Sequence, residues 1–411
     1  MPSEKLSASP LRRLFAAVGP GLVTAAVVLG PGSITVSSKC GAVLGYSALW
    51  ALVIAVVLMV TYTHMGARLG MASSESLVSL TARHLGRWVA VLMGLCGFLI
   101  CSGFQTGNNV GVGVAMNALV GGSPGLWAVV FTLAALAVLW SSSSLYKLLE
   151  HLMMALVGLM ILCFVGDLLM VRPDFPALAR GLWPSRGVDM GLITAISATT
   201  LSVAAAAFQA YLVQSKGWTA GDLRKGLRDV IIGIVTLGSI TAVIMVTSAA
   251  VLKPAGITVT SAADMALQLE PLLGRAARWL FLVGLWAGAF SSFIVNAMIG
   301  GTFLADSLGW GSRLSDRGPR LLGSAVMLFG AGVAMMAGRN PIQLLVMAQA
   351  TTILGVPLMA TVMLILANRR DVMPTTLRNG LASNLIGGLG LAWLLALSLR
   401  QAAAYLKPLW N

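Results

Sequence analysis

Residues 14–38 form a stretch of twenty-five residues without a charged side chain, and the run Gly30-Pro31-Gly32-Ser33 lies inside it. A helix in lipid must satisfy its backbone hydrogen bonds internally, whereas Pro31 removes a donor and the glycines weaken the helical state. A break at membrane depth is tolerated where protein or a polar cavity replaces the lost partners, and transporters bind substrates at such breaks. An ordinary proline kink packed against a neighbouring helix is the alternative. The run favours a broken helix at a binding site.

The composition is that of an all-α integral membrane protein. Hydrophobic residues make up 58% of the chain, charged residues make up 10%, and the mean hydropathy is +0.90. A membrane-spanning helix needs about 20 apolar residues, and the apolar runs here are far longer than the strands of a membrane barrel. They predict about eleven transmembrane helices in a single transporter domain over residues 1–411, at approximately 14–43, 47–69, 87–119, 126–146, 148–171, 190–215, 228–251, 277–305, 320–338, 341–367 and 377–400.

Basic residues are distributed unevenly among the connections between these helices. The net charge is +14, and most Lys and Arg residues fall on the side of the membrane that holds the N-terminus. This bias predicts a cytoplasmic N-terminus and an outer C-terminus, in the inner membrane of a bacterium. The charge therefore requires no nucleic-acid partner. The four cysteines lie in predicted helices without a C-x-x-C pair, so no disulfide framework is expected. The first thirteen residues are basic on balance and no cleavage-like site precedes the first predicted helix, so no removable signal peptide is expected.

Four predicted helices carry polar side chains on one face. Such side chains either bond membrane helices to one another or line a substrate cavity. Four polar faces together with a broken helix favour a shared polar cavity. The faces consist of Gln105, Asn108 and Asn109; Thr199, Ser202 and Gln209 with Ala206 between them; Ser291, Ser292 and Asn296; and Gln349 and Thr352.

No carboxylate is predicted at mid-depth on these polar faces. The thirteen Asp and Glu residues lie in connections or near helix ends, as Asp167 and Asp306 do. Lys39 is the cation furthest inside a predicted span, about 9 Å beyond the break at about 1.5 Å per residue. It either extends to the interface or faces the cavity in place of a coupling cation. No cluster of His, Asp and Glu and no nucleophile–base pair lies in the spans, so an enzyme is not expected.

Several motifs, in order along nearly the whole chain, resemble those of the NRAMP family of divalent-metal transporters. They are Gly19-Pro20-Gly21, Gly30-Pro31-Gly32-Ser33, Gly41-Ala42-Val43-Leu44-Gly45-Tyr46, Ala67-Arg68-Leu69-Gly70, Asn117, Tyr146-Lys147-Leu148-Leu149-Glu150, Arg172-Pro173-Asp174, Gly284-Leu285, Ser291-Ser292, and Pro341-x-Gln343-Leu344-Leu345-Val346 with Gln349. The resemblance implies a leucine-transporter-like fold of two inverted five-helix repeats, about 14–171 and 190–367, with a peripheral helix at about 377–400. It also implies that helices one and six are unwound at the site.

The metal-binding motifs of that family are altered in this chain. The family's Asp-Pro-Gly-Asn motif is Gly30-Pro31-Gly32-Ser33 here, and its Met-Pro-His motif aligns with Ala206-Ala207-Phe208. Its acidic pair on helix three aligns with Gln105 and Asn108. A dehydrated divalent cation needs anionic or several oxygen ligands, and transition metals prefer nitrogen or sulfur. No site for a bare metal ion is therefore expected, whereas Mg²⁺ keeps several waters and stays open as a cargo.

The sequence thus predicts a secondary active transporter that works by alternating access and symport, with Na⁺ or H⁺ as the coupling ion and no cofactor. Members of the family without the metal motif resemble permeases associated with 5-oxoproline. The predicted cargo is accordingly a small organic molecule with a carboxylate, such as 5-oxoproline or an amino-acid derivative. The alternative is a Mg²⁺ or Mn²⁺ transporter with an altered site, and a sensor that binds without transport is a further one.

The candidate site residues come from the break, the polar faces and the resemblance. The positive end of the helix that starts near Ser33 suits a carboxylate. The predicted partners are this cargo and the lipid bilayer, and the oligomeric state stays open. The substrate-binding candidates are Gly30, Pro31, Gly32, Ser33, Gln105, Asn108, Ser202, Ala206, Gln209, Tyr211 and Gln349, and the candidates for the coupling ion are Lys39, Ser291, Ser292 and Asn296.

Overall fold

The computed structural model describes residues 30–407 apart from 142, 186, 314 and 337–339. The first half of the predicted first helix, 14–29, lies outside the described residues. The helices are α3 (Pro31–Leu44), α4 (Leu49–Ala72), α5 (Leu77–Leu85), α6 (Arg87–Val120), α7 (Pro124–Trp140), α8 (Ser143–Val171), α9 (Phe175–Gly181), α10 (Met190–Thr200), α11 (Val203–Ser215), α12 (Leu223–Val251), α13 (Ala262–Ala266), α14 (Glu270–Leu273), α15 (Ala276–Leu308), α16 (Arg317–Met335), α17 (Pro341–Thr351), α18 (Val356–Asn368) and α19 (Leu381–Leu406), with 3₁₀ segments η1 (Gly45–Ala48), η2 (Ala220–Asp222), η3 (Leu267–Leu269) and η4 (Thr352–Gly355).

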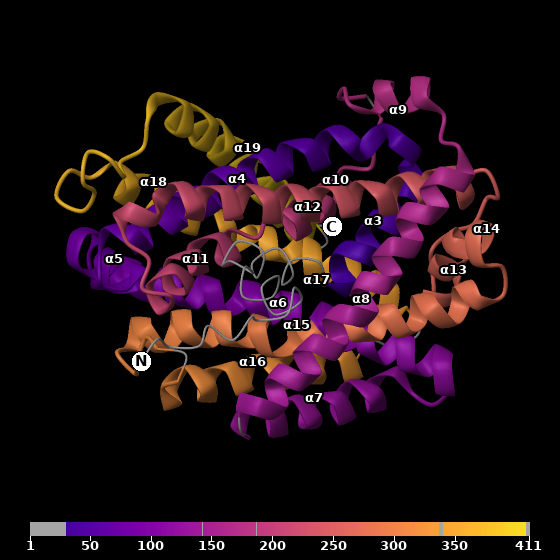
Figure 1. Ribbon diagram of the computed structural model, residues 1–411, viewed down its shortest axis with the longest axis horizontal. Helices are drawn as coiled ribbons and strands as arrows, with labels where there is room; N and C mark the ends of the chain where they lie inside the picture. The colour runs from indigo at the N-terminus through magenta and orange to yellow at the C-terminus, as the bar shows by residue number, and fades with distance from the viewer. Residues whose placement is uncertain (1–29, 142, 186, 314, 337–339, 408–411) are drawn as a thin grey trace, which may run out of the picture.

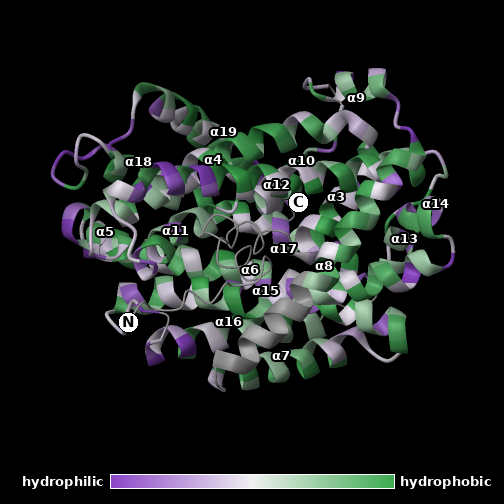
Figure 2. Ribbon diagram, in the orientation of Figure 1, coloured by the Kyte–Doolittle hydropathy of each residue, from purple (hydrophilic) through white to green (hydrophobic). Residues whose placement is uncertain are grey.

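The predicted membrane helices are all represented in this part of the chain. Eight helical stretches are long and apolar enough to cross a membrane, and two shorter apolar helices accompany them, Pro124–Trp140 and Ala155–Val171. The stretch Pro31–Ala72 contains the end of the first predicted helix and the whole of the second. In Figure 2 the hydrophobic residues cover the helices, while hydrophilic ones gather mainly at the two ends of the bundle. The all-α membrane architecture is therefore confirmed.

The long helices lie side by side along the longest axis of the molecule (Figure 1). The helix α15 packs extensively against α6 and also contacts α16 and α8, while α11 packs against α4 and α12 against α3. The short helices α9, α13 and α14 lie together at one end, and α5 lies at the other. Because α5 is short and bounded by polar residues, the hydrophobic runs did not predict it.

Local sequence signals explain where many helices begin. A proline occupies the first turn of α3, α7 and α17, where its missing N–H costs nothing and its fixed φ suits the helix. At α5 the hydroxyl of Ser76 accepts a hydrogen bond from the N–H of Ser79, 3.0 Å away. At α10 the carboxylate of Asp189 accepts one from the N–H of Gly191 at 2.8 Å. Each contact satisfies a backbone donor of the first helical turn.

The sixth predicted helix is broken, as the family resemblance implied, and the break lies at Leu201–Ser202. The ψ angles there are 76° and 88°, and the hydroxyl of Ser202 accepts a hydrogen bond from the N–H of Ala205 at 3.4 Å, which starts α11. The break precedes by several residues the positions 206–208 aligned with the family's Met-Pro-His motif. It also separates Thr199 from Ser202, so these two do not share a continuous helical face. No proline or glycine lies at the break, and Ser202 caps the helix that starts there.

The tenth predicted helix, 341–367, is also divided. Helix α17 ends at Thr351, η4 covers Thr352–Gly355, and α18 restarts with Pro357 in its first turn. A 3₁₀ segment within a helix often marks a hinge. The proline explains the division, because it cannot donate to a carbonyl one turn earlier.

Small residues let helices approach one another closely, as is common in membrane bundles. At Gly66 an added Cβ would collide with the carbonyl oxygen of Ala206, so the backbones of α4 and α11 are in contact. A Cβ at Gly41 would likewise collide with the carbonyl oxygen of Met245 on α12. These contacts hold the broken helices α3 and α11 against unbroken neighbours.

A buried hydrogen bond ties α11 to α15. The hydroxyl of Tyr211 donates to Oδ2 of Asp306 at 2.7 Å, and both side chains are buried. The ring of Tyr211 also stacks on Phe208 and meets Phe303 edge-on. The half-helix α11 is thus fixed to α15 at the end of the bundle that holds α5.

We expect Tyr211→Phe to destabilise the protein in detergent by about 1–3 kcal/mol, because the buried carboxyl of Asp306 loses a donor. Tyr62→Phe is the matched control, since its hydroxyl donates to the carbonyl oxygen of Gly387 at 2.9 Å, a neutral acceptor. Its loss is expected to be smaller, about 1 kcal/mol. Denaturant unfolding of the two variants measures the difference, and an equal or reversed order would contradict the assignment.

Candidate functional site

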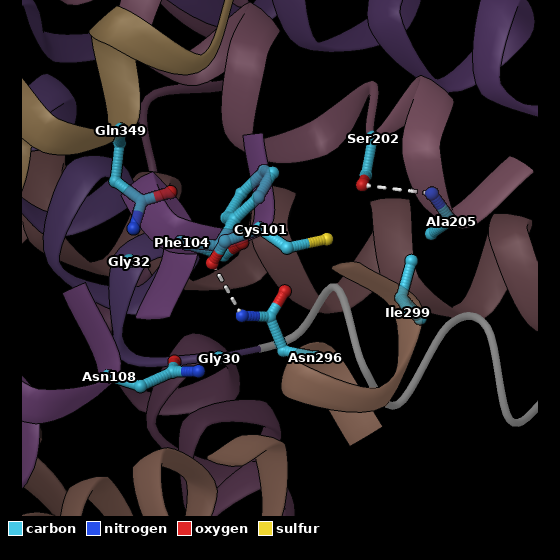
Figure 3. A pocket seen from close by; sticks show the side chains of 11 residues that line it. Gly30, Gly32, Cys101, Phe104, Asn108, Ser202, Ala205, Asn296, Ile299 and Gln349 are labelled. Atoms are coloured by element: carbon cyan, nitrogen blue, oxygen red, sulfur yellow. Dashed lines mark hydrogen bonds between the residues drawn. The ribbon is translucent and has the colours of Figure 1, made fainter. Parts of the chain in front are cut away.

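The start of α3, the break in the sixth predicted helix and Gln349, three residues before the break in the tenth, border one small cavity of about 20 Å³. Such a volume holds about one water molecule. Figure 3 shows side chains from α6, α15 and α17 around the start of α3, with Ser202 on the opposite side. The lining residues are Gly30, Gly32, Ser33, Cys101, Phe104, Asn108, Ser202, Ala205, Asn296, Ile299 and Gln349.

The N-terminus of α3 lies at this cavity, and Gly30, Gly32 and Ser33 line it. Gly30 is extended (φ −95°, ψ −176°) and its carbonyl accepts the first helical hydrogen bond, from the N–H of Ile34 at 3.2 Å. Donors of the first turn have no acceptor within a helix, and the helix dipole adds a partial positive charge there. Pro31, which has no N–H, packs instead against Gly111 of α6. The break thus presents an electropositive surface made of backbone.

Gln349 supplies an acceptor to the same cavity. Its side chain is 1% exposed, and Oε1 has no hydrogen-bond partner among the residues that the structure describes. A Cβ placed on Gly32 would lie 2.5 Å from the amide carbon of Gln349, so a glycine at this position lets the amide lie against α3 (Figure 3). An unpartnered buried amide oxygen costs free energy, which a ligand that donates a hydrogen bond would recover.

A network of neutral amides forms the wall opposite Gln349. The amide nitrogen of Asn296 donates to the carbonyl oxygen of Cys101 at 2.8 Å and to Oε1 of Gln105 at 3.2 Å. Oε1 of Gln105 also accepts a hydrogen bond from Nδ2 of Asn108 at 3.4 Å, and Nε2 of Gln105 donates one to Oδ1 of Asn109 at 3.1 Å. Gln105 therefore lies behind the cavity and orients the two asparagines that line it.

The structure places six of the eleven predicted substrate-binding residues around the cavity. Ala206 and Gln209 lie next to Gly66, against α4, and Tyr211 bonds to Asp306. Gln105 acts through Asn108 and Asn296 rather than at the surface of the cavity. The predicted residues that line the cavity are Gly30, Gly32, Ser33, Asn108, Ser202, Gln349 and, from the coupling-ion candidates, Asn296.

The other coupling-ion candidates lie outside the cavity lining. Nζ of Lys39 donates to Oε1 of Gln343 on α17 at 3.0 Å, so Lys39 joins α3 to α17. The hydroxyls of Ser291 and Ser292 both donate to the carbonyl oxygen of Gly288, at 3.1 Å and 2.9 Å. Ser292 lies beside Gly30, where a Cβ would be 3.5 Å from its hydroxyl. Residues 27–29, which precede Gly30 in the chain, lie outside the described residues.

Four lining residues were not predicted from the sequence: Cys101, Phe104, Ala205 and Ile299. Each lies about one helical turn from a predicted residue, since Phe104 precedes Asn108 by four positions and Ile299 follows Asn296 by three. Helical spacing could therefore have found them. They are apolar or weakly polar, which is why a search for polar faces passed over them.

Next to the cavity, α3 is held by the connection between α12 and α15. Nε2 of Gln268, a fully buried residue of η3, donates to the hydroxyl of Ser38 at 2.9 Å. The hydroxyl of Ser248 donates to the carbonyl oxygen of Ser38 at 2.5 Å. These bonds secure the half-helix whose N-terminus forms the site.

The donor set of the cavity is neutral. Amide groups, hydroxyls and backbone donors line it, and Cys101 is the one lining residue of a type that soft metals prefer. Across the described ranges, no three His, Cys, Asp or Glu side chains come together. The break at Leu201–Ser202 also carries no Met, Pro or His. The site can thus exchange hydrogen bonds and attract an anion, but it offers no anionic ligand.

Comparison with known proteins gives related folds and sequences. A family model described as natural resistance-associated macrophage protein-like matches residues 21–403. The divalent metal cation transporter MntH of Yersinia pestis is 24% identical over 89% of this chain and 90% of its own length, and that of Deinococcus radiodurans is 26% identical over 88% and 84%. The structure of a manganese transporter of Eremococcus coleocola, bound to an aromatic bis-isothiourea compound, superposes with a TM-score of 0.78 at 18% identity, covering 98% of this chain and 90% of that one.

These matches bear out the resemblance drawn from the motifs and the leucine-transporter-like fold that it implied. The names of the relatives support divalent-metal transport, the alternative prediction, better than they support an organic cargo. The family model extends over nearly the whole chain and includes all the residues that line the cavity. The chain therefore belongs to the natural resistance-associated macrophage protein-like (NRAMP) family of membrane transporters.

Proposed function

We propose that this NRAMP-family transporter carries a small organic molecule with a carboxylate and an N–H donor, such as 5-oxoproline or a related amino-acid derivative, by symport with Na⁺ or H⁺. The observation that carries the proposal is that the N-terminus of α3 and Oε1 of Gln349, which has no partner among the described residues, border the same cavity. A carboxylate suits the helix end, and an N–H suits the amide oxygen.

The electrostatics of the cavity support an anionic cargo. Among the described residues, the lining contains no carboxylate that would repel it. Asn108 has a second amide hydrogen besides the one that it donates to Gln105. Phe104 and Ile299 offer apolar surface to the carbon skeleton. A bare divalent cation would instead enter a site without anionic ligands, and desolvating it there costs more than neutral oxygens return.

The cavity must enlarge for such a cargo to bind, because about 20 Å³ accommodates about one water molecule. The interruptions at Leu201–Ser202 and Thr352–Gly355 are the natural places for this movement, since the regular α-helical hydrogen-bond pattern is interrupted there. Alternating access in this class of fold is largely movement of helices around a fixed central site. On this proposal, a volume of about 20 Å³ is that of a closed site.

Transport of a hydrated divalent cation is the second candidate, and the names of the relatives favour it. Mg²⁺ keeps several waters, and the side-chain oxygens of Asn108, Asn296 and Gln349 could accept hydrogen bonds from them. The two candidates differ in the charge of the cargo. Uptake into proteoliposomes of labelled 5-oxoproline in parallel with Mn²⁺ and Mg²⁺ separates them.

Gln349→Leu is expected to lower kcat/KM for 5-oxoproline uptake by about 5- to 150-fold, since a buried hydrogen bond contributes about 1–3 kcal/mol. Gln343→Leu on the same helix is the matched control, because Gln343 is exposed and bonds to Lys39 outside the cavity. Its uptake should stay within about twofold of the unaltered protein. Equal losses in both variants would contradict the role of Gln349.

The double variant Gly30→Asp, Ser33→Asn restores the family's first-helix motif and is expected to gain saturable Mn²⁺ binding that the unaltered protein lacks. A Cβ at Gly30 would lie 3.3 Å from Oδ1 of Asn108, so an aspartate needs only a small adjustment. A carboxylate supplies the anionic ligand that the cation requires. Isothermal titration with Mn²⁺ measures the gain, and Mn²⁺ binding or flux in the unaltered protein would favour the cation candidate instead.

We also propose the topology indicated by the basic connections, with the N-terminus inside and the C-terminus outside the cytoplasmic membrane of a bacterium. A membrane-impermeant thiol reagent added to intact cells should label Ala255→Cys and leave Ser215→Cys unlabelled. Both positions are exposed: Ser215 is the last residue of α11, before α12, and Ala255 lies in the connection after α12. Permeabilised cells should show labelling of both, and the reverse pattern in intact cells would invert the topology.

A further inference from the structure

A second, larger pocket lies on the other side of α6 from the substrate cavity. It measures about 450 Å³ and is bordered by α6, α16, α17, η4 and the end of α19. Pockets of this size lie within the range that binds small organic ligands. None of the sites discussed above uses it, since the substrate candidates do not line it.

The walls of this pocket are chemically apolar, although four hydroxyl-bearing residues of α6, α17 and η4 contribute to them. Ser102 donates to the carbonyl oxygen of Phe98 at 2.8 Å, and Thr106 donates to that of Ser102 at 3.0 Å. Thr352 donates to the carbonyl oxygen of Gln349 at 2.7 Å. Because these hydroxyl hydrogens are taken up by backbone carbonyls, the walls favour an apolar ligand over a polar one.

At one end of the pocket, the remaining hydroxyls are paired with each other. Thr351 donates to the carbonyl oxygen of Met347 at 2.8 Å, and its oxygen is hydrogen-bonded to the hydroxyl of Tyr405 on α19. The pair joins the end of α17 to α19. It therefore closes the pocket with groups that are already satisfied.

The pocket is continuous with the surface that faces lipid. Three of its lining side chains, Leu99, Phe329 and Met347, are 54%, 51% and 44% exposed and come from three different helices. In membrane-spanning helices, such side chains contact the hydrocarbon of the bilayer. The species next to the opening is consequently an acyl chain. Apolar walls and an apolar occupant match, and neither loses hydrogen bonds to water on contact.

We propose that this pocket binds one acyl chain of a membrane phospholipid. The acyl chain would contact one face of α6, and the opposite face of α6 contributes Cys101 and Phe104 to the substrate cavity. It would also contact η4, the 3₁₀ segment that follows Gln349 by three residues. At Gly103 an added Cβ would lie 2.8 Å from Cγ2 of Thr352, so α6 and this segment are in close contact beside the pocket. The bound acyl chain would fill the space next to η4, the segment that would act as a hinge. This inference does not depend on the identity of the cargo.

The test uses the full-length protein in vesicles that contain phosphatidylglycerol with a photoactivatable diazirine near the end of one acyl chain. After irradiation, peptide mapping is expected to find crosslinks concentrated in residues 96–106 and 344–355. Ala348→Phe places a ring in the pocket and should reduce these crosslinks about tenfold, because burial of the chain is lost. Val333→Phe, from α16, fills the pocket from another wall and should act in the same direction.

Ala134→Phe is the control, since Ala134 is exposed on α7 and does not line the pocket. It should leave the labelling of 96–106 and 344–355 unchanged. Labelling spread evenly over the exposed faces of all helices would overturn the proposal. Labelling of the pocket that persists in both filling variants would also overturn it, provided that thermal unfolding shows both variants to be folded.

Discussion

In the hydrocarbon of a membrane, a polypeptide must supply a partner for each of its own backbone polar groups. In the described residues, the first-helix segment begins with Pro31, and two further membrane stretches are interrupted, at Leu201–Ser202 and at Thr352–Gly355. All three lie at or beside one cavity, so the groups released by one interruption are close to those released by the others. The polar side chains of α6, α15 and α17 gather there for the same reason. The position of the site therefore depends on where the helices are interrupted as much as on which side chains are present.

The chemistry of that site differs from what its family and relatives suggest. A carboxylate in the position of Gly30 would be available to a cation, and acids in place of Gln105 and Asn108 could exchange protons. In this chain, position 30 is a glycine without a side chain, and positions 105 and 108 carry neutral amides. The amide oxygen of Gln105 accepts hydrogen bonds from Asn108 and Asn296 and so orients them. Amides do not titrate near neutral pH, so this wall keeps one hydrogen-bonding pattern across that range. In the same fold, these side chains therefore orient hydrogen-bonding groups of the site and carry no negative charge.

Much of the fold follows from the hydrophobic runs, because each run is long enough to span and too long for a strand. Pro31 marked the start of α3 for a local reason, and Gln349 was recognisable as a polar group in an apolar helix. The break at Leu201–Ser202 had no such mark. Its hydrogen bond to Ala205 stabilises either a helix start or an ordinary helix face, and packing against neighbouring helices decides between them. Tyr211 illustrates the same limit: its place in the sequence beside the expected site did not reveal that Asp306, ninety-five positions later, would be its partner.

Through the contact between Gln268 and Ser38, the connection between α12 and α15 helps to hold a helix of the binding site in place. Such connections are the usual places to insert an affinity tag or a fluorescent protein, or to raise an antibody, on the assumption that they are inert. In this protein, any insertion that pulls η3 away also withdraws a support from the half-helix that forms the binding site. Tags and fluorescent proteins are better inserted elsewhere. An antibody that binds this segment would be expected to alter transport as well as to mark the protein.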